Sequence, residues 1–277
     1  RLFRRRCRAV RDPCSPSRAI LSRVKSIFDD DAELYDAIRP GYPDALVDDV
    51  IALSALPPRG RILEVACGTG QATSAFARRG HRITAVELGA NMAAVARRRL
   101  AAYPDVEIRV GAFEEAELSP ASFDLAISAT AFHWIESARG LAKIADALVP
   151  GGSIALFWNE HVRGDADVGF FDAVQELYEH AGLRRWPLKP IDEVADRSAE
   201  LANSGRFGEV AVRRHAWEES YDADRYVQLL STYSDHRRLP LRTRAELLDG
   251  IRKLIDSRFG GRIVKSYAAV LYHARVL

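Results

Sequence analysis

The sequence has little cysteine and no long apolar run. Its three cysteines, Cys7, Cys14 and Cys67, are too few and too scattered for a disulfide framework or a cysteine-based zinc site, and we expect no metal. No apolar stretch approaches the roughly 18 residues that cross a bilayer, so we expect no membrane association. There is no internal repeat. These absences favour a soluble, cytoplasmic protein. The length of 277 residues suits one large domain, or one domain with an added cap.

Acidic residues are scarce only at the beginning of the chain. Residues 1–25 hold eight arginines and one lysine against the single acid Asp12, and since the whole chain has a net charge of +2, the remainder carries −6. An enzyme that acts on nucleic acid usually has its basic surface on the folded domain, so nucleic acid is not the expected partner. We expect 1–25 to be a disordered, solvated tail, with polyanion binding as the alternative, and 26–277 to form the functional domain.

From residue 61 onward, short apolar runs alternate with helical stretches. Parallel strands need crossover connections, so this alternation predicts an α/β fold with a doubly wound, mostly parallel sheet, seven-stranded once two C-terminal strands are added. Residues 166–204, which are turn-rich and lack a clear strand, are expected to form a helical cap over the carboxyl edge of the sheet. The predicted strands are 62–66, 83–87, 106–110, 123–128, 153–158, 210–217 and 263–272; the main helices are 71–79, 90–102, 137–148, 222–235 and 242–258.

The strongest local signal is an apolar strand that continues into a glycine turn and then a helix, ILEVACGTGQAT over 62–73. Gly68 and Gly70 let the backbone approach a ligand closely, and the N-terminus of the helix offers unpaired N–H groups. Glu87 ends the next strand, 19 positions after Gly68, where an acid can accept two hydrogen bonds from a ribose diol. The pattern therefore predicts a cofactor that contains a nucleoside.

The spacing also bears on which cofactor this is. The dinucleotide fingerprint has a third glycine three residues after Gly70, where this chain has Thr73. A β-branched residue hinders the close helix–strand packing that makes room for a pyrophosphate. S-adenosylmethionine (SAM) has no phosphate and lacks this requirement, so SAM is favoured over a nicotinamide dinucleotide.

Residues 64–70 resemble motif I of class I SAM-dependent methyltransferases, acid-x-Gly-x-Gly-x-Gly, with Ala66 in place of the first glycine. The cofactor half of the domain lies at about 60–160. Residues 35–43, together with 131–134 after the fourth strand, resemble the branch that includes trans-aconitate methyltransferases. The resemblance implies a SAM-dependent methyltransferase. Four further stretches follow motif I in the family's order: ELGANM at 87–92, GAFEE at 111–115, FDLA at 123–126 and LVPGG at 148–152.

The resemblance also implies roles for single residues. Glu87 would hold the ribose hydroxyls, Glu64 would help to hold the ammonium group, and Leu88 and Met92 would pack on adenine. Plain core packing is the alternative reading for Met92 and Phe113, and a surface acid for Glu87. The other cofactor-binding residues would be Ala66, Gly68, Thr69, Gly70, Gln71, Ala112, Phe113 and Ser128.

His133 and Trp134 follow the fourth strand, at the edge where the methyl group should point. We expect them to line the acceptor pocket, with structural roles as the alternative. A histidine base would be useful for a phenol or alcohol and unnecessary for a carboxylate. Weaker pocket candidates are Tyr35, Tyr42, Trp158, Asn159 and Tyr233.

The expected acceptor is a small molecule with an oxygen nucleophile, such as a carboxylate or phenol. Enzymes that methylate exocyclic base nitrogens carry Asp/Asn-Pro-Pro-aromatic where this chain has SATA at 128–131. An RNA or DNA methyltransferase and a catalytically inactive SAM-binding protein are the alternatives. The sequence identifies neither the acceptor nor the oligomeric state.

Overall fold

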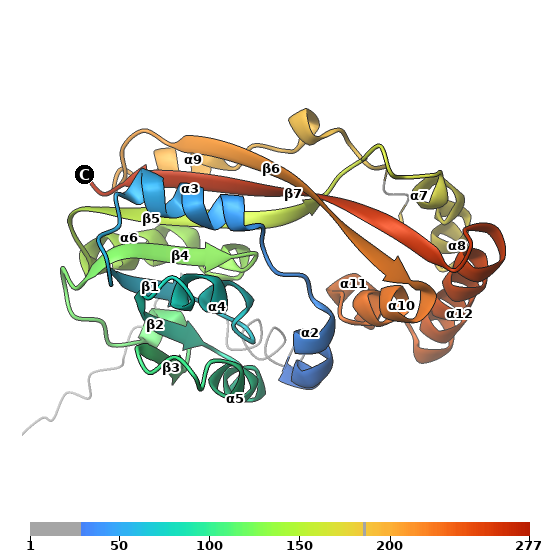
Figure 1. Cartoon of the computed structure of the whole chain (residues 1–277), viewed down its shortest axis with the longest axis horizontal. Helices are drawn as coiled ribbons and strands as arrows, with labels where there is room; N and C mark the ends of the chain where they lie inside the picture. The colour runs from blue at the N-terminus through green and yellow to red at the C-terminus, as the bar shows by residue number, and fades with distance from the viewer. Residues whose placement is uncertain (1–28, 185–186) are drawn as a thin grey trace, which may run out of the picture.

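The computed structural model describes residues 29–184 and 187–277, and a seven-stranded sheet runs through it (Figure 1). The strand order is β3-β2-β1-β4-β5-β7-β6; β1 to β5 pair in parallel, whereas β7 is antiparallel to both β5 and β6. This confirms the predicted doubly wound, mostly parallel α/β sheet. The predicted tail, 1–25, lies outside the described residues. The strands are β1 (Arg61–Val65), β2 (Arg82–Glu87), β3 (Val106–Val110), β4 (Phe123–Ala129), β5 (Leu148–His161), β6 (Ala211–Asp222) and β7 (Arg262–Arg275).

Helices cover both faces of the sheet because its central strands are apolar on both sides. Ile62 packs in one core cluster, whereas its neighbours Leu63 and Val65 pack in another. The two clusters lie on opposite faces because successive side chains of a strand point in opposite directions. The covering helices are α3 (Asp44–Ser54), α4 (Gln71–Ala77) and α5 (Ala90–Arg99) on the first face and α6 (Ser137–Ala147) on the second.

β6 and β7 form a long twisted ribbon that extends beyond the parallel strands (Figure 1). They pair continuously from Ala211 with His273 to Asp222 with Arg262, so both strands are longer than predicted. The far end of the ribbon packs on a third apolar cluster, which includes Phe170. The helices of this end are α7 (Phe170–Ala173), α8 (Gln175–His180), α10 (Ala223–Ser231), α11 (Ser234–Arg237) and α12 (Leu241–Arg258), and α2 (Ala32–Ile38) contacts α10 and α5.

The helix predicted over 222–235 is broken into α10 and α11. Thr232, which is buried, donates its hydroxyl to the carbonyl oxygen of Leu229 at 2.6 Å, and the next residue, Tyr233, has an extended backbone with φ −83° and ψ 137°. Local hydrogen bonding by threonine competes with the helical pattern in this way. Tyr233 therefore belongs to neither helix.

The segment predicted as a cap, 166–204, divides between two places. α7 and α8 join the third cluster, whereas η3 (Ile191–Glu193) and α9 (Ser198–Ala202) pack on the second cluster through Ile191 and Leu201. Each part covers apolar surface that the long ribbon would otherwise leave exposed. The segment is thus shared between the sheet and the C-terminal helices.

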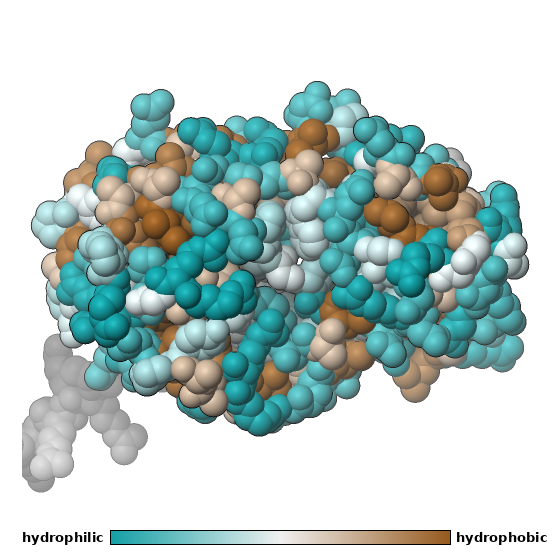
Figure 2. Space-filling view, viewed as in Figure 1, coloured by the Kyte–Doolittle hydropathy of each residue, from teal (hydrophilic) through white to brown (hydrophobic). Residues whose placement is uncertain are grey.

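Few large hydrophobic side chains are exposed among the described residues: Val110, Val168, Leu241 and Leu277. Figure 2 shows hydrophilic residues over most of the visible face, with apolar residues in small separate groups. Within 29–184 and 187–277, no helix combines the length and hydropathy that crossing a membrane requires.

Candidate active site

One cavity of about 510 Å³ lies beyond the carboxyl ends of β1, β2 and β4. Its size falls within the range of small-molecule pockets, and this edge is where open α/β sheets bind ligands. It brings together ten of the residues predicted from the sequence and four of the weaker candidates. They are Ala66, Gly68, Gln71, Glu87, Leu88, Met92, Ala112, Phe113, His133 and Trp134, with Tyr35, Tyr42, Asn159 and Tyr233.

Some predicted residues lie behind the cavity wall. Ser128 is fully buried and donates its hydroxyl to the carbonyl oxygen of Val65 at 3.0 Å, so it fastens β4 to the end of β1 instead of contacting a ligand. Thr69 is also fully buried and accepts a hydrogen bond from the side chain of Gln71 at 2.7 Å. Three further predicted residues also do not line the cavity: Glu64, Gly70 and Trp158.

The turn after β1 has a left-handed backbone at three alternate positions. The φ angles are +56° at Ala66, +59° at Gly68 and +91° at Gly70. This conformation is easy for glycine but costs an alanine about 1–2 kcal/mol, so Ala66 is a strained residue at the edge of the cavity. A side chain at Gly68 would point at Met92 Cε, 3.5 Å away, and at Tyr35. The glycine thus keeps the space between these two side chains open.

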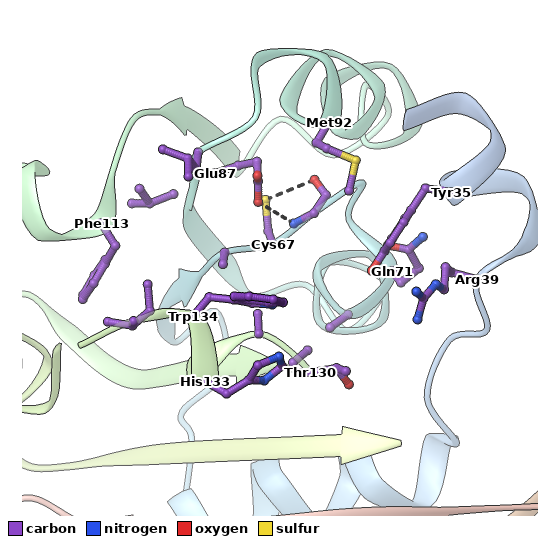
Figure 3. Close-up of a pocket in the computed structure, with 18 of the residues that line it drawn as sticks. Tyr35, Arg39, Cys67, Gln71, Glu87, Met92, Phe113, Thr130, His133 and Trp134 are labelled. Atoms are coloured by element: carbon purple, nitrogen blue, oxygen red, sulfur yellow. Dashed lines mark hydrogen bonds between the residues drawn. The ribbon is translucent and has the colours of Figure 1, made fainter. Parts of the chain in front are cut away.

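Glu87 lies at the centre of the cofactor end and is 8% exposed. Its two carboxylate oxygens accept hydrogen bonds from the backbone N–H groups of Gly68 and Gly89, both at 2.8 Å. Figure 3 draws the one from Gly68. Burial raises the pKa of Glu87, and these two hydrogen bonds oppose the rise. A carboxylate has about four lone-pair sites, so two remain for a ligand. The geometry fits an acid that holds a ribose diol while bracing the glycine turn.

Glu64 is a buried acid whose carboxylate has no hydrogen-bond partner among the described residues. It is fully buried, and neither carboxylate oxygen makes a hydrogen bond in the described part of the chain. Burial raises the pKa of Glu64 to about 8, and the charge of Glu87 adds to the rise. The nearby Thr73 hydroxyl opposes the rise only in part, because it is not in hydrogen-bonding geometry with the carboxylate. Such a group is stabilised by a nearby positive charge. An acid in this state beneath the glycine turn fits a cofactor that carries an ammonium group.

The apolar wall of the cavity consists of Leu88, Met92 and Phe113. Met92 is positioned by Asp29, whose carboxylate accepts hydrogen bonds from the N–H groups of Asn91 and Met92 at 2.7 and 3.0 Å, at the start of α5. An acid at the N-terminus of a helix is favourable. Sequence analysis missed Asp29, because the contact joins residues 62 positions apart.

His133 and Trp134 form a short helix, η2 (Phe132–Trp134), after β4, and their rings lie 4.9 Å apart. In Figure 3, Trp134 lies between Glu87 on one side and His133 on the other. The indole N–H of Trp158 donates to Nδ1 of His133 at 3.3 Å. An indole can only donate, so Nδ1 is the acceptor and the proton of the neutral ring is on Nε2. Burial, and then the charge of Arg197, lower the pKa of His133, which favours this neutral ring.

The wall opposite the glycine turn comes from segments that sequence analysis ranked low. Tyr42 bonds the hydroxyl of Thr130 at 2.7 Å, and Asn159 donates to the carbonyl oxygen of Gly41 at 2.9 Å, so the loop after α2 is fastened to the ends of β4 and β5. Arg39 and Tyr233 complete this wall. No described residue of 166–204 lines the cavity, which corrects the expectation that this segment caps the acceptor: its helices are held by the second and third clusters instead.

Comparison with known proteins agrees with this geometry. The profile of a family described as "Methyltransferase domain" matches residues 62–152. An uncharacterised methyltransferase of Mycobacterium tuberculosis is 29% identical over 221 residues, which cover 80% of this chain and 82% of that protein. A second one from the same organism is 30% identical over 156 residues, which cover 52% of this chain and 76% of the relative.

Solved structures show the same architecture. A protein from Anaeromyxobacter dehalogenans, assigned to the type II methyltransferases, superimposes with a TM-score of 0.62 and 28% identity over 86% of this chain and 97% of its own. A phosphoethanolamine N-methyltransferase of Haemonchus contortus shares the fold, with a TM-score of 0.53 and 19% identity over 93% of this chain and 59% of its own. The resemblance to trans-aconitate methyltransferases stays a prediction. The chain belongs to the class I SAM-dependent methyltransferases, and SAM is its methyl donor.

Proposed function

We propose that this protein methylates an oxygen nucleophile of a small molecule, with donor and acceptor held in the single cavity. The observation that carries the proposal is the continuity of that cavity: the glycine turn and Glu87 line one end, and His133, Trp134 and Tyr233 line the other. A cavity of about 510 Å³ lies within the size range of small-molecule pockets.

For the cofactor end, we assign roles from the contacts described above. Glu87 holds the ribose hydroxyls with its two free lone-pair sites, and Leu88, Met92 and Phe113 surround the adenine. Ala66 and Gly68 line the methionine portion, and Glu64 stabilises its ammonium group from beneath the turn. When bound, SAM supplies an electrophilic methyl group on a sulfonium.

For the acceptor end, the residues act mainly by holding the nucleophile in line with the methyl group. Well-oriented reactants can gain about 7–11 kcal/mol from positioning alone. Trp134 offers a flat apolar surface beside the glycine turn, and the Nε2–H of His133 can donate a hydrogen bond to an acceptor oxygen. The loop attached by the hydrogen bonds of Tyr42 and Asn159 forms the wall on the opposite side.

Cofactor binding is tested first, by calorimetry with SAM and S-adenosylhomocysteine (SAH). Glu87→Gln should lower the affinity for both ligands by tenfold or more, because it removes charge-assisted hydrogen bonds to the ribose. Glu107→Gln is the matched control, since Glu107 is an exposed acid on the neighbouring strand β3 that pairs with Arg109. Unchanged affinity in Glu87→Gln would contradict the assignment of the ribose site.

Acceptor class is tested by measuring SAH formation with a panel of small phenols, alcohols, carboxylates and amines, and by identifying each product by mass spectrometry. We expect methylated oxygen, with turnover reduced in Trp134→Ala and His133→Ala at unchanged SAM affinity. A panel in which only amines are methylated would overturn the oxygen assignment, and turnover on RNA or DNA alone would overturn the small-molecule assignment.

A further inference from the structure

Lys265 is a buried lysine without an acidic partner in the described part of the chain. It lies on β7, is 3% exposed, and donates from Nζ to the hydroxyl of Tyr233 at 3.3 Å. Its ammonium group also lies over the rings of Tyr233 and Tyr267, 5.5 and 5.2 Å from their centroids. A buried ammonium costs several kcal/mol unless a negative charge compensates it. The group that Lys265 contacts at its charged end is the phenol of Tyr233.

A second cation approaches Tyr233 from the other side. The guanidinium of Arg39 is 4.6 Å from the centroid of the Tyr233 ring and 5.0 Å from that of Tyr35. It donates to the hydroxyl and the carbonyl oxygen of Thr232, both at 2.9 Å, and forms no ion pair with an acid among the residues described. The acid next in the chain, Asp235, is held by the ring of His236 at 2.8 Å. Two cations thus converge on one phenol.

The remaining neighbours of Tyr233 described here are aromatic side chains. Four tyrosines interact electrostatically with Tyr233: Tyr178, Tyr221, Tyr226 and Tyr267. The centroid of the His236 ring lies 5.9 Å from that of the Tyr233 ring. In the described chain, Tyr233 is the tyrosine whose pKa is lowered: burial raises it, but Lys265 and then Arg39 outweigh that effect. Burial raises the pKa of Tyr42 and of Tyr267, which also line the cavity.

We propose that Tyr233 is the proton acceptor of the methyl transfer, activated by Lys265 and Arg39, and that the substrate therefore carries a proton on its nucleophilic oxygen, as a phenol does. This inference rests on the proposed function and selects among its acceptors, because a carboxylate nucleophile needs no base. Lysine has no acceptor site, so Tyr233 accepts its hydrogen bond. A phenolate oxygen has three lone pairs, so with Lys265 and Tyr267 as donors one is left for the substrate proton. Tyr233, His133 and Trp134 line the same cavity.

The step balances as follows in atoms and charge. The Tyr233 phenolate takes the proton of the acceptor hydroxyl, and an oxygen lone pair forms the bond to the methyl carbon. The carbon–sulfur bond breaks, and its electron pair stays on sulfur, which loses its positive charge. The products are the methyl ether, the neutral thioether and neutral Tyr233, which returns its proton to solvent. Lys265 contacts the base Tyr233 and takes no proton itself, so it acts as a positioning residue.

The first test needs no acceptor, so its failure is separate from failure of the proposed function. The full chain is titrated with alkali while tyrosinate absorbance is recorded, for the wild type, Tyr233→Phe, Lys265→Met and the control Tyr103→Phe, which removes a half-buried tyrosine outside the cavity. We expect one tyrosine to ionise below the ordinary pKa of 10. That step should be absent in Tyr233→Phe, present in Tyr103→Phe and moved to higher pH in Lys265→Met. A low-pH step that persists in Tyr233→Phe, or no such step in the wild type, would overturn the proposal.

The second test uses the acceptors found by the panel. Tyr233→Phe should reduce kcat by about a hundredfold or more for phenols, in the range of general base catalysis, and should change turnover of carboxylates little. In Lys265→Met, the rise of kcat with pH should move to higher pH, a change that a structural role alone does not cause. SAM affinity and circular dichroism confirm that each variant folds. Wild-type turnover of phenols by Tyr233→Phe would contradict the assignment.

Discussion

Replacing Glu64 with glutamine should remove a pH dependence from the stability of the protein. Burial raises the pKa of Glu64 to about 8 from an ordinary value of 4.5. Because the folded protein holds this proton more tightly than the unfolded chain, the contribution of the group to stability is complete below pH 4.5 and is lost as the pH rises through 8. One pKa unit corresponds to about 1.4 kcal/mol, so the total loss is about 5 kcal/mol.

The assay is urea unfolding of the ligand-free protein at two pH values within that window, about pH 5.5 and about pH 7.5. The free energy of unfolding of Glu64→Gln, relative to that of the wild type, should increase by about 2.5 kcal/mol between them. Glu107→Gln is the control: Arg109 lowers the pKa of Glu107, so that acid is ionised throughout the window and its loss should add no pH dependence.

A cofactor readout accompanies the stability measurement. If Glu64 stabilises the ligand's ammonium group, bound ligand lowers the pKa of Glu64, and the affinity for SAH should rise with pH in the wild type but not in Glu64→Gln. The reasoning is refuted if wild type and Glu64→Gln show parallel stability curves, because the carboxyl would then not be titrating in the window that its burial implies.

Two further predictions concern the glycine turn and His133. Gly80→Ala places a methyl group in open space at φ +81° and should lower the free energy of unfolding by about 1–2 kcal/mol. In Gly70→Ala, at φ +91°, the new Cβ also meets Leu100 Cδ1 at 3.0 Å, so the stability loss should be larger. Equal losses in urea unfolding would show that the Leu100 side chain moves aside at no cost. The imidazole of His133 should be the Nε2–H tautomer and remain neutral below pH 6.5, and Trp158→Phe should abolish this tautomer preference; an Nδ1–H signal in nitrogen NMR of the wild type would contradict the hydrogen bond from Trp158.

The cofactor half could be predicted from the sequence because its signals are local. A strand, a glycine turn and a helix are contiguous, and Glu87 follows one βα unit later, so periodicity and spacing place them at one edge of a parallel sheet. Ser128 shows the limit of this reasoning. It lies near the end of β4, at the edge of the sheet where the cavity is, but its hydroxyl donates to the carbonyl oxygen of Val65. The apolar pattern of the strand does not reveal that hydrogen bond.

The acceptor half was decided by tertiary structure. Arg39 and Thr232 are 193 positions apart and Tyr233 and Lys265 are 32 apart, and no periodicity relates a loop after α2 to the break between two C-terminal helices. That break depends on the local hydrogen bond of Thr232, and the burial of Lys265 depends on the ribbon of β6 and β7 extending beyond the sheet. Sequence by itself thus determined the fold class and the cofactor, because repeated local patterns encode both. Only the packed structure determined which charged side chains meet in the cavity, because burial and the pairing of distant charges exist only after the chain has folded.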